Sequence, residues 1–128
     1  MDPQDLRYSP THEWARLDGD SCTVGISQFA VDQLTDVVYI ELPEVGDRVT
    51  AGQRFGTIES VKAVSDLYAP VSGEITAVNS KLVNDTSPIG QDPYGKGWMV
   101  KIKLGPGANL EGLLTPAKYQ EQIASQDH

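Results

Sequence analysis

The sequence predicts a mainly β protein, a small sandwich or flattened barrel with a helical C-terminus. Apolar and polar residues alternate over 22–26, 38–42 and 98–104, as expected of strands that bury one face. Turns that contain glycine separate these stretches. With 12 Gly and 8 Pro among 128 residues, the chain is rich in turns but far from low-complexity composition.

The first strand is expected where Cys22, Val24 and Ile26 share a face. Ser27 follows at once, and its hydroxyl suits the N-cap of a short helix. The apolar residues of that helix are Phe29, Val31 and Leu34.

The next strand is expected where Val38, Ile40 and Leu42 share a face. Beyond it, Phe55–Ser60 and Val64–Ala69 are each strand-like, and only three residues separate them. So short a connection is typical of the tip of a β-hairpin.

The clearest alternation lies near the C-terminus. One face of this strand carries Trp98, Val100, Ile102 and Leu104, and the other carries Met99, Lys101 and Lys103. Thr115 then caps a helix that begins at Pro116 and extends to about residue 125, because Pro is favoured at the first helical position. Tyr119 and Ile123 share one face of that helix.

The length and the net charge of the chain limit which classes of protein it can belong to. A chain of 128 residues and 13.9 kDa predicts one domain over residues 1–128. Its net charge of −8 opposes binding to nucleic acid. No apolar stretch approaches the roughly 20 residues of a membrane span, which predicts a protein that binds no membrane. Residues 1–5 resemble neither a signal nor a transit peptide, so we expect a cytoplasmic protein, or a mitochondrial matrix protein if the chain is a processed form.

Motifs for catalysis or metal binding are incomplete. The pair His12-Glu13 resembles the start of a zinc-binding helix, but the second histidine is absent four residues later. Cys22 is the only cysteine, and its alternating strand favours a place in the core. Gly52 and Gly56 lack the third glycine of a phosphate-binding loop. The sequence therefore predicts neither an enzyme nor a metal site.

The most informative stretch is the hairpin tip. Lys62 lies at its centre, with Glu59, Ser60 and Asp66 close by in the sequence. A surface lysine is usually only a solubilising charge. This tip, however, lacks the Asn-Gly or Asp-Gly turn that a structural hairpin favours, and it presents one amine among carboxylates. That arrangement suits a modification site that an enzyme recognises.

Six motifs along the chain resemble the H proteins of the glycine cleavage system, a family of lipoyl carriers. They are His12-Glu13-Trp14, Val24-Gly25-Ile26, DVVYIELPEVGD over 36–47, ESVKAVSDLYAPVSGEI over 59–75, DPYGKGW over 92–98 and LLTPAKY over 113–119. The resemblance implies a β-sandwich of the barrel-sandwich-hybrid type. It also implies that lipoate is joined to the side-chain nitrogen of Lys62 as an amide.

The same resemblance implies a carrier subunit that catalyses no step itself. A pyridoxal-phosphate (PLP) glycine decarboxylase would load an aminomethyl group onto the arm, and a tetrahydrofolate-dependent aminomethyltransferase would take the one-carbon unit. A dihydrolipoyl dehydrogenase with FAD and NAD would reoxidise the arm, and a lipoyl ligase or transferase would attach it. We expect a monomer, because a shuttle needs its arm free on all approaches.

Three carboxylates near the hairpin are candidates for supporting roles. Glu59, three residues before Lys62, is interpreted as a recognition flank for the ligase, with an ordinary edge charge as the alternative. Glu13 and Asp66 match family positions suited to sheltering the loaded arm, since a carboxylate would attract its ammonium group. Each could equally be a solvated surface carboxylate.

The chain departs from the family pattern at Gln33, at Thr35 and over 86–90, away from Lys62. Two other functions are compatible with a lysine at a hairpin tip. A lipoyl or biotinyl domain cut from a larger enzyme is disfavoured, because the chain lacks an Ala/Pro-rich tether and a Met beside Lys62. An H-like scaffold that relays lipoyl groups to the lipoyl domains of other enzymes stays open.

Overall fold

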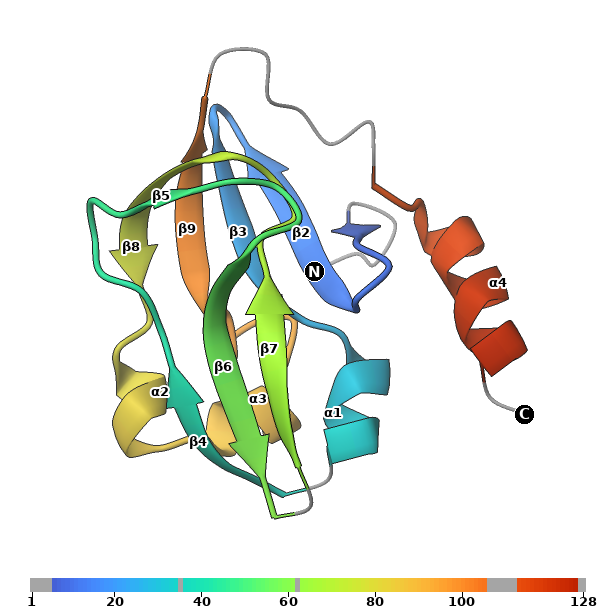
Figure 1. Ribbon diagram of the computed structural model, residues 1–128. Coiled ribbons are helices and arrows are strands. Elements are labelled where there is room, and N and C mark those ends of the chain that lie inside the picture. Colours follow the sequence, from blue (N-terminus) through green and yellow to red (C-terminus); the bar gives the residue numbers. More distant parts are fainter. Residues whose placement is uncertain (1–5, 35, 62, 106–112, 127–128) are drawn as a thin grey trace.

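The computed structural model describes residues 6–34, 36–61, 63–105 and 113–126, and it contains two antiparallel sheets that face each other (Figure 1). The larger sheet has the strand order β1-β2-β3-β9-β8-β5, with bounds Arg7–Tyr8, Glu13–Asp18, Ser21–Ile26, Val100–Leu104, Gly73–Val78 and Arg48–Val49. The smaller has the order β4-β6-β7, with bounds Val37–Glu41, Arg54–Ser60 and Val64–Tyr68. The predicted mainly β sandwich is confirmed.

Four helices accompany the sheets in the described residues: α1 (Gln28–Leu34), α2 (Lys81–Asn84), α3 (Ser87–Gln91) and α4 (Pro116–Gln126). Both predicted caps are present. The hydroxyl of Ser27 accepts from the Ala30 N–H at 3.2 Å, and that of Thr115 accepts from the Lys118 N–H at 3.3 Å. The sequence pattern did not indicate α2 and α3. None of the helices within the described ranges is long and apolar enough to cross a membrane.

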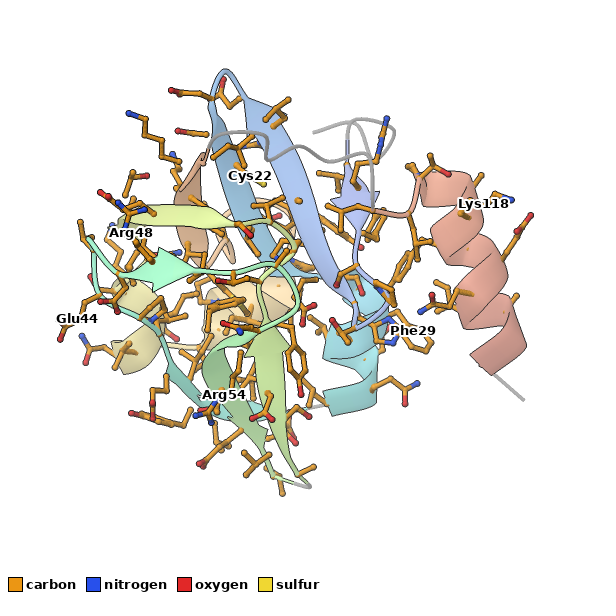
Figure 2. The ribbon with its side chains drawn as sticks, turned by 45° about the horizontal axis from the view of Figure 1, so that its top comes forward. Cys22, Phe29, Glu44, Arg48, Arg54 and Lys118 are labelled. Carbon is orange, nitrogen blue, oxygen red and sulfur yellow. The ribbon has the colours of Figure 1, made fainter. Side chains whose placement is uncertain are left out.

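The main core lies between the two sheets. The small sheet contributes Ile40, Ile58 and Leu67, and the large sheet contributes Cys22, Val24, Ile75, Val100 and Ile102. Cys22 lies in the large sheet (Figure 2), and burial raises the pKa of its thiol to about 12. A thiol with so high a pKa is inert at neutral pH, in agreement with the predicted core role.

A second apolar cluster lies on the other face of the large sheet, against α4. It consists of Leu6, Tyr8, Trp14 and Tyr119. Trp14 packs directly on β3, because Gly25 leaves room for its ring: a Cβ at Gly25 would lie 2.7 Å from the indole nitrogen. Both faces of β3 are covered, so the strand expected from its alternation to be half-buried is buried from Cys22 to Ile26.

Two further details of the predicted strands are wrong. Val38 is exposed, because the register of β4 against β6 shifts between Val37 and Tyr39 and turns Val37 toward the core. Met99 is fully buried, because the regular alternation of β9 begins only at Val100.

Candidate functional site

The hairpin formed by β6 and β7 is held at its tip by one side chain. The buried hydroxyl of Ser60 accepts from the Ala63 N–H at 3.1 Å and donates to the Ala63 carbonyl at 3.2 Å. The Ser60 N–H also donates to that carbonyl at 2.8 Å, and the Val61 N–H donates to the Asp36 carbonyl at 3.0 Å. The residues on both sides of the tip are therefore fixed, while Lys62 itself lies outside the described residues.

Glu59 lies on the central strand of the small sheet. It pairs with Tyr39 of β4 on one side and with Val64 of β7 on the other. Its neighbour Ile58 is buried in the core, so the side chain of Glu59 points to the outer face of the sheet. Glu59 therefore does not lie on an edge strand, because β6 has β4 on one side and β7 on the other.

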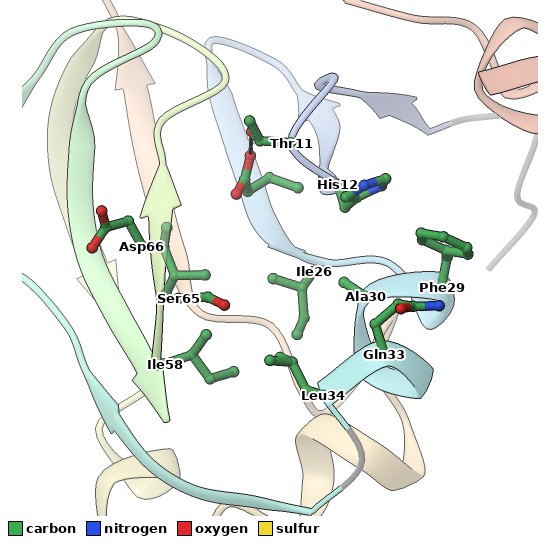
Figure 3. A pocket seen from close by; sticks show the side chains of 12 residues that line it. Thr11, His12, Ile26, Phe29, Ala30, Gln33, Leu34, Ile58, Ser65 and Asp66 are labelled. Atoms are coloured by element: carbon green, nitrogen blue, oxygen red, sulfur yellow. Dashed lines mark hydrogen bonds between the residues drawn. The ribbon is translucent and has the colours of Figure 1, made fainter. Parts of the chain in front are cut away.

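A cavity of about 300 Å³ opens beside the hairpin, between β7, α1 and the turn before β2 (Figure 3). Apolar side chains form most of its wall: Ile26, Phe29, Ala30, Leu34, Ile58 and Leu67. The polar lining residues are Thr11, His12, Glu13, Gln33, Ser65 and Asp66. Ser65 lies only two residues beyond Ala63, about 7 Å along an extended strand. The cavity is therefore within reach of a long side chain on the tip.

Glu13 is a buried carboxylate with three donors around it. One oxygen accepts from the Ser9 hydroxyl at 2.5 Å and from the Thr11 hydroxyl, and the other accepts from the Tyr68 N–H at 3.2 Å. Tyr68 lies on the edge strand β7, so Glu13 joins the turn before β2 to the hairpin. Burial raises the pKa of Glu13, and the hydrogen bonds from Ser9 and Thr11 oppose that shift.

Asp66 also belongs to the cavity wall, but its carboxyl group points away from it, to the other side of β7 (Figure 3). There it lies 3.7 Å from the Arg54 guanidinium and accepts from the Tyr68 hydroxyl at 3.4 Å. The structure brings Glu13 and Asp66 to one cavity, but it does not bring their carboxylates together.

A polar network lies at the edge of the cavity, and no sequence pattern indicated it. The Tyr119 hydroxyl lies 2.8 Å from Nδ1 of His12 and 2.5 Å from the hydroxyl of Ser27. The ring of Tyr119 stacks on Tyr8 at 4.2 Å, and the ring of His12 lies 4.9 Å from that of Phe29. His12 has φ of 78°, a left-handed conformation that a non-glycine residue adopts only where its surroundings hold it. The helix α4 thus holds one wall of the cavity in place.

This network gives a first prediction. Tyr119→Phe removes the hydroxyl that lies between His12 and Ser27. The buried hydroxyl of Ser27 then has one partner fewer, which should lower the free energy of unfolding by about 1–2 kcal/mol. The melting temperature should fall by roughly 4–8 °C. Tyr39→Phe, at an exposed tyrosine, is the control and should melt like the wild type. Equal melting of Tyr119→Phe and wild type in differential scanning calorimetry would show that the network adds no stability.

Comparison with known proteins shows the family to which the chain belongs. A family model described as "Glycine cleavage H-protein" matches residues 6–126. The chain is 52% identical to the glycine cleavage system H protein of Rubrobacter xylanophilus, over 98% of this chain and 97% of that protein. It is 53% identical to the one of Thermosynechococcus vestitus, over 94% of each chain.

A solved structure is similar over nearly the whole chain. The crystal structure of a glycine cleavage system H protein from Mycobacterium marinum matches with a TM-score of 0.88 and 43% identity, covering 96% of this chain and 99% of that one. Sequence and fold therefore agree along almost the entire length, and the chain belongs to the glycine cleavage H-protein family.

Proposed function

We propose that the protein is a lipoyl-lysine carrier of glycine cleavage and that Lys62 is the attachment site. The observation that carries the proposal is the hairpin whose residues on both sides of position 62 are held by hydrogen bonds of Ser60 and Asp36, beside a mainly apolar cavity. In this proposal residues 1–128 act as one carrier domain, and the protein works in the cytoplasm of a bacterial cell.

Attachment needs only the amine of Lys62 and an activated lipoate. A lipoyl ligase lets the carboxylate of lipoate attack the α-phosphorus of ATP, which releases pyrophosphate and forms lipoyl-adenylate. The lysine nitrogen then attacks the carbonyl carbon of the adenylate. The amide bond forms, the bond between that carbon and the phosphate oxygen breaks, AMP leaves, and the protons lost by the ammonium go to water. The positive charge of Lys62 disappears.

Lipoate supplies a reactive sulfur at the end of a long flexible arm. The chain then moves the aminomethyl unit from a PLP-dependent glycine decarboxylase to a tetrahydrofolate-dependent aminomethyltransferase, and dihydrolipoyl dehydrogenase restores the disulfide with FAD and NAD. The chain catalyses none of these steps. Its net charge of −8 suits brief docking as a monomer, because electrostatic steering speeds encounter and adds little lasting affinity.

The cavity fits such an arm. Its walls of Ile26, Ile58 and Leu67 suit an aliphatic chain, and Glu13 supplies a carboxylate for a cationic end group. Asp66 lies at the same wall, but its carboxyl group points to the other side of β7, toward Arg54, so Glu13 is the main carboxylate in this role. Folding the loaded arm into this space would limit the access of water to the aminomethyl group.

Peptide mass spectrometry of the protein from its native cells tests the proposal. The expected result is a lipoyl amide on the peptide that contains Lys62 and on no other lysine peptide. The other lysines, Lys81, Lys96, Lys101, Lys103 and Lys118, have unrelated flanking residues. Lipoate on one of these instead of Lys62 would refute the assignment.

Glu59 gives a second prediction. Glu59→Gln keeps the shape of a side chain that points outward but removes its charge, so a ligase should lipoylate Lys62 with a KM about five- to tenfold higher. The stability should stay within about 0.5 kcal/mol of wild type, as is typical of surface positions. Glu44→Gln, in an exposed loop, is the matched control. If the KM of Glu59→Gln equals that of the wild type, the ligase does not recognise Glu59, and this residue is only a solvated charge.

A further inference from the structure

Two apolar side chains and a carboxylate form a row on the outer face of the small sheet. The strand register places Tyr39, Glu59 and Val64 side by side, one from each strand. Tyr39 is 42% exposed and Val64 is 64% exposed, and Val61, at the tip itself, is 70% exposed. We call these four residues the tip face. Exposed apolar side chains gathered at one place are typical of an interaction site.

Among the described residues of the hairpin, the outer face is more open to a protein partner than the inner face. On the inner face, Ile58 and Leu67 are buried in the core and Ser65 lines the cavity. An enzyme that acts on the amine of the tip must bring its reacting carbon to within about 3–3.5 Å of the nitrogen. It will therefore cover side chains one or two residues from the tip, and the tip face provides them.

The charge around the tip face indicates what kind of surface fits it. The next row of the sheet contains Glu41, Thr57 and Asp66. With Glu59 this makes three carboxylates, and Arg54 pairs with only one of them, Asp66. A complementary partner thus has an apolar pocket surrounded by Lys or Arg.

We propose that the tip face is the docking surface for the enzyme that acylates Lys62, with Tyr39 and Val64 seated in an apolar pocket and Glu59 facing a basic rim. This inference rests on the proposed function, since it takes Lys62 as the residue that is modified. It adds Tyr39 and Val64, which lie on strands on either side of Glu59, to the residues that the ligase recognises.

The test measures lipoylation by a bacterial lipoate ligase with saturating ATP and lipoate. Tyr39→Ser, Val64→Ser and the double variant should raise the KM for the protein, the double variant about tenfold or more, with kcat unchanged. Tyr39→Phe should restore the wild-type KM, because it keeps the ring. Val45→Ser is the matched control, since Val45 is also 64% exposed and lies in the loop after β4. Melting temperatures of all variants should match the wild type.

Three results would overturn the inference, each for a different reason. If the wild-type protein is not modified on Lys62, both the proposed function and this docking surface are refuted. If the wild-type protein is modified on Lys62 and the double variant has the same KM, the proposed function stands and only the docking surface is refuted. Sedimentation that shows a wild-type dimer and a monomeric double variant would assign the tip face to contact between copies of this chain.

Discussion

Lys62→Arg should abolish lipoylation completely and leave the fold intact. Arginine keeps the positive charge of the tip, but its guanidinium stays protonated at neutral pH and does not attack an acyl group as an amine does. The hydrogen bonds that hold the tip involve Ser60, Ala63, Val61 and Asp36, so the exchange leaves them in place. Intact mass after incubation with a lipoate ligase, ATP and lipoate is the measurement.

Lys103→Arg provides the matched control for this experiment. Lys103 lies on β9 of the large sheet and is exposed, and its flanking residues bear no relation to those of Lys62. This variant should gain one lipoyl group, like the wild type. A lipoyl group on Lys62→Arg would contradict the proposal, because the acceptor would then be another lysine.

Glu13→Ala should produce the largest loss of stability. The substitution leaves the hydroxyls of Ser9 and Thr11 and the N–H of Tyr68 without the acceptor they share. Ser9 is buried, whereas Thr11 is exposed and its hydroxyl can bond to water, so the cost comes mainly from Ser9 and Tyr68. A donor left without its partner costs about 1–3 kcal/mol, and a total of about 3 kcal/mol would lower the melting temperature by roughly 10 °C. Glu13→Gln keeps an acceptor for the two hydroxyls and should lose less. A wild-type melting temperature for Glu13→Ala would show that these bonds add nothing to folding.

The same residue tests the shelter proposed for the loaded arm. Water releases the aminomethyl group as formaldehyde and ammonia, and the carboxylate of Glu13 should slow that release by holding the ammonium. A hydrogen bond to a charged group is worth about 1.5–3 kcal/mol, so Glu13→Gln should speed release about tenfold or more while lipoylation of Lys62 proceeds normally. Asp66→Ala should speed it less, because its carboxylate lies toward Arg54. Wild-type release rates in both variants would refute the carboxylate assignment.

Local patterns predicted the parts of the fold that local chemistry determines. The helix caps at Ser27 and Thr115 follow from hydroxyls placed just before the first residues of the two helices. The hairpin follows from two strand-like stretches joined by three residues. The exposed Val38 was missed because a β-bulge shifts the side-chain alternation without any mark in the sequence.

The cavity could be predicted only in outline. The family resemblance singled out Glu13 and Asp66, but no local pattern indicates that Glu13 accepts from Tyr68, 55 residues away in sequence. The contact between His12 and Tyr119 spans 107 residues, and it depends on how α4 packs against the large sheet. Such contacts are set by tertiary packing, which periodicity and capping rules do not describe.

Reconstituted glycine oxidation tests most directly whether the protein carries the aminomethyl group of glycine cleavage on Lys62. Lipoylated wild-type protein, glycine decarboxylase, aminomethyltransferase and dihydrolipoyl dehydrogenase are combined with glycine, tetrahydrofolate and NAD, and NADH is followed by absorbance. NADH formation should require glycine, and it should be absent when Lys62→Arg replaces the wild-type protein. If the lipoylated protein supports no NADH formation, yet passes its lipoyl group to the lipoyl domain of another enzyme, it is a relay scaffold and not a carrier of glycine cleavage.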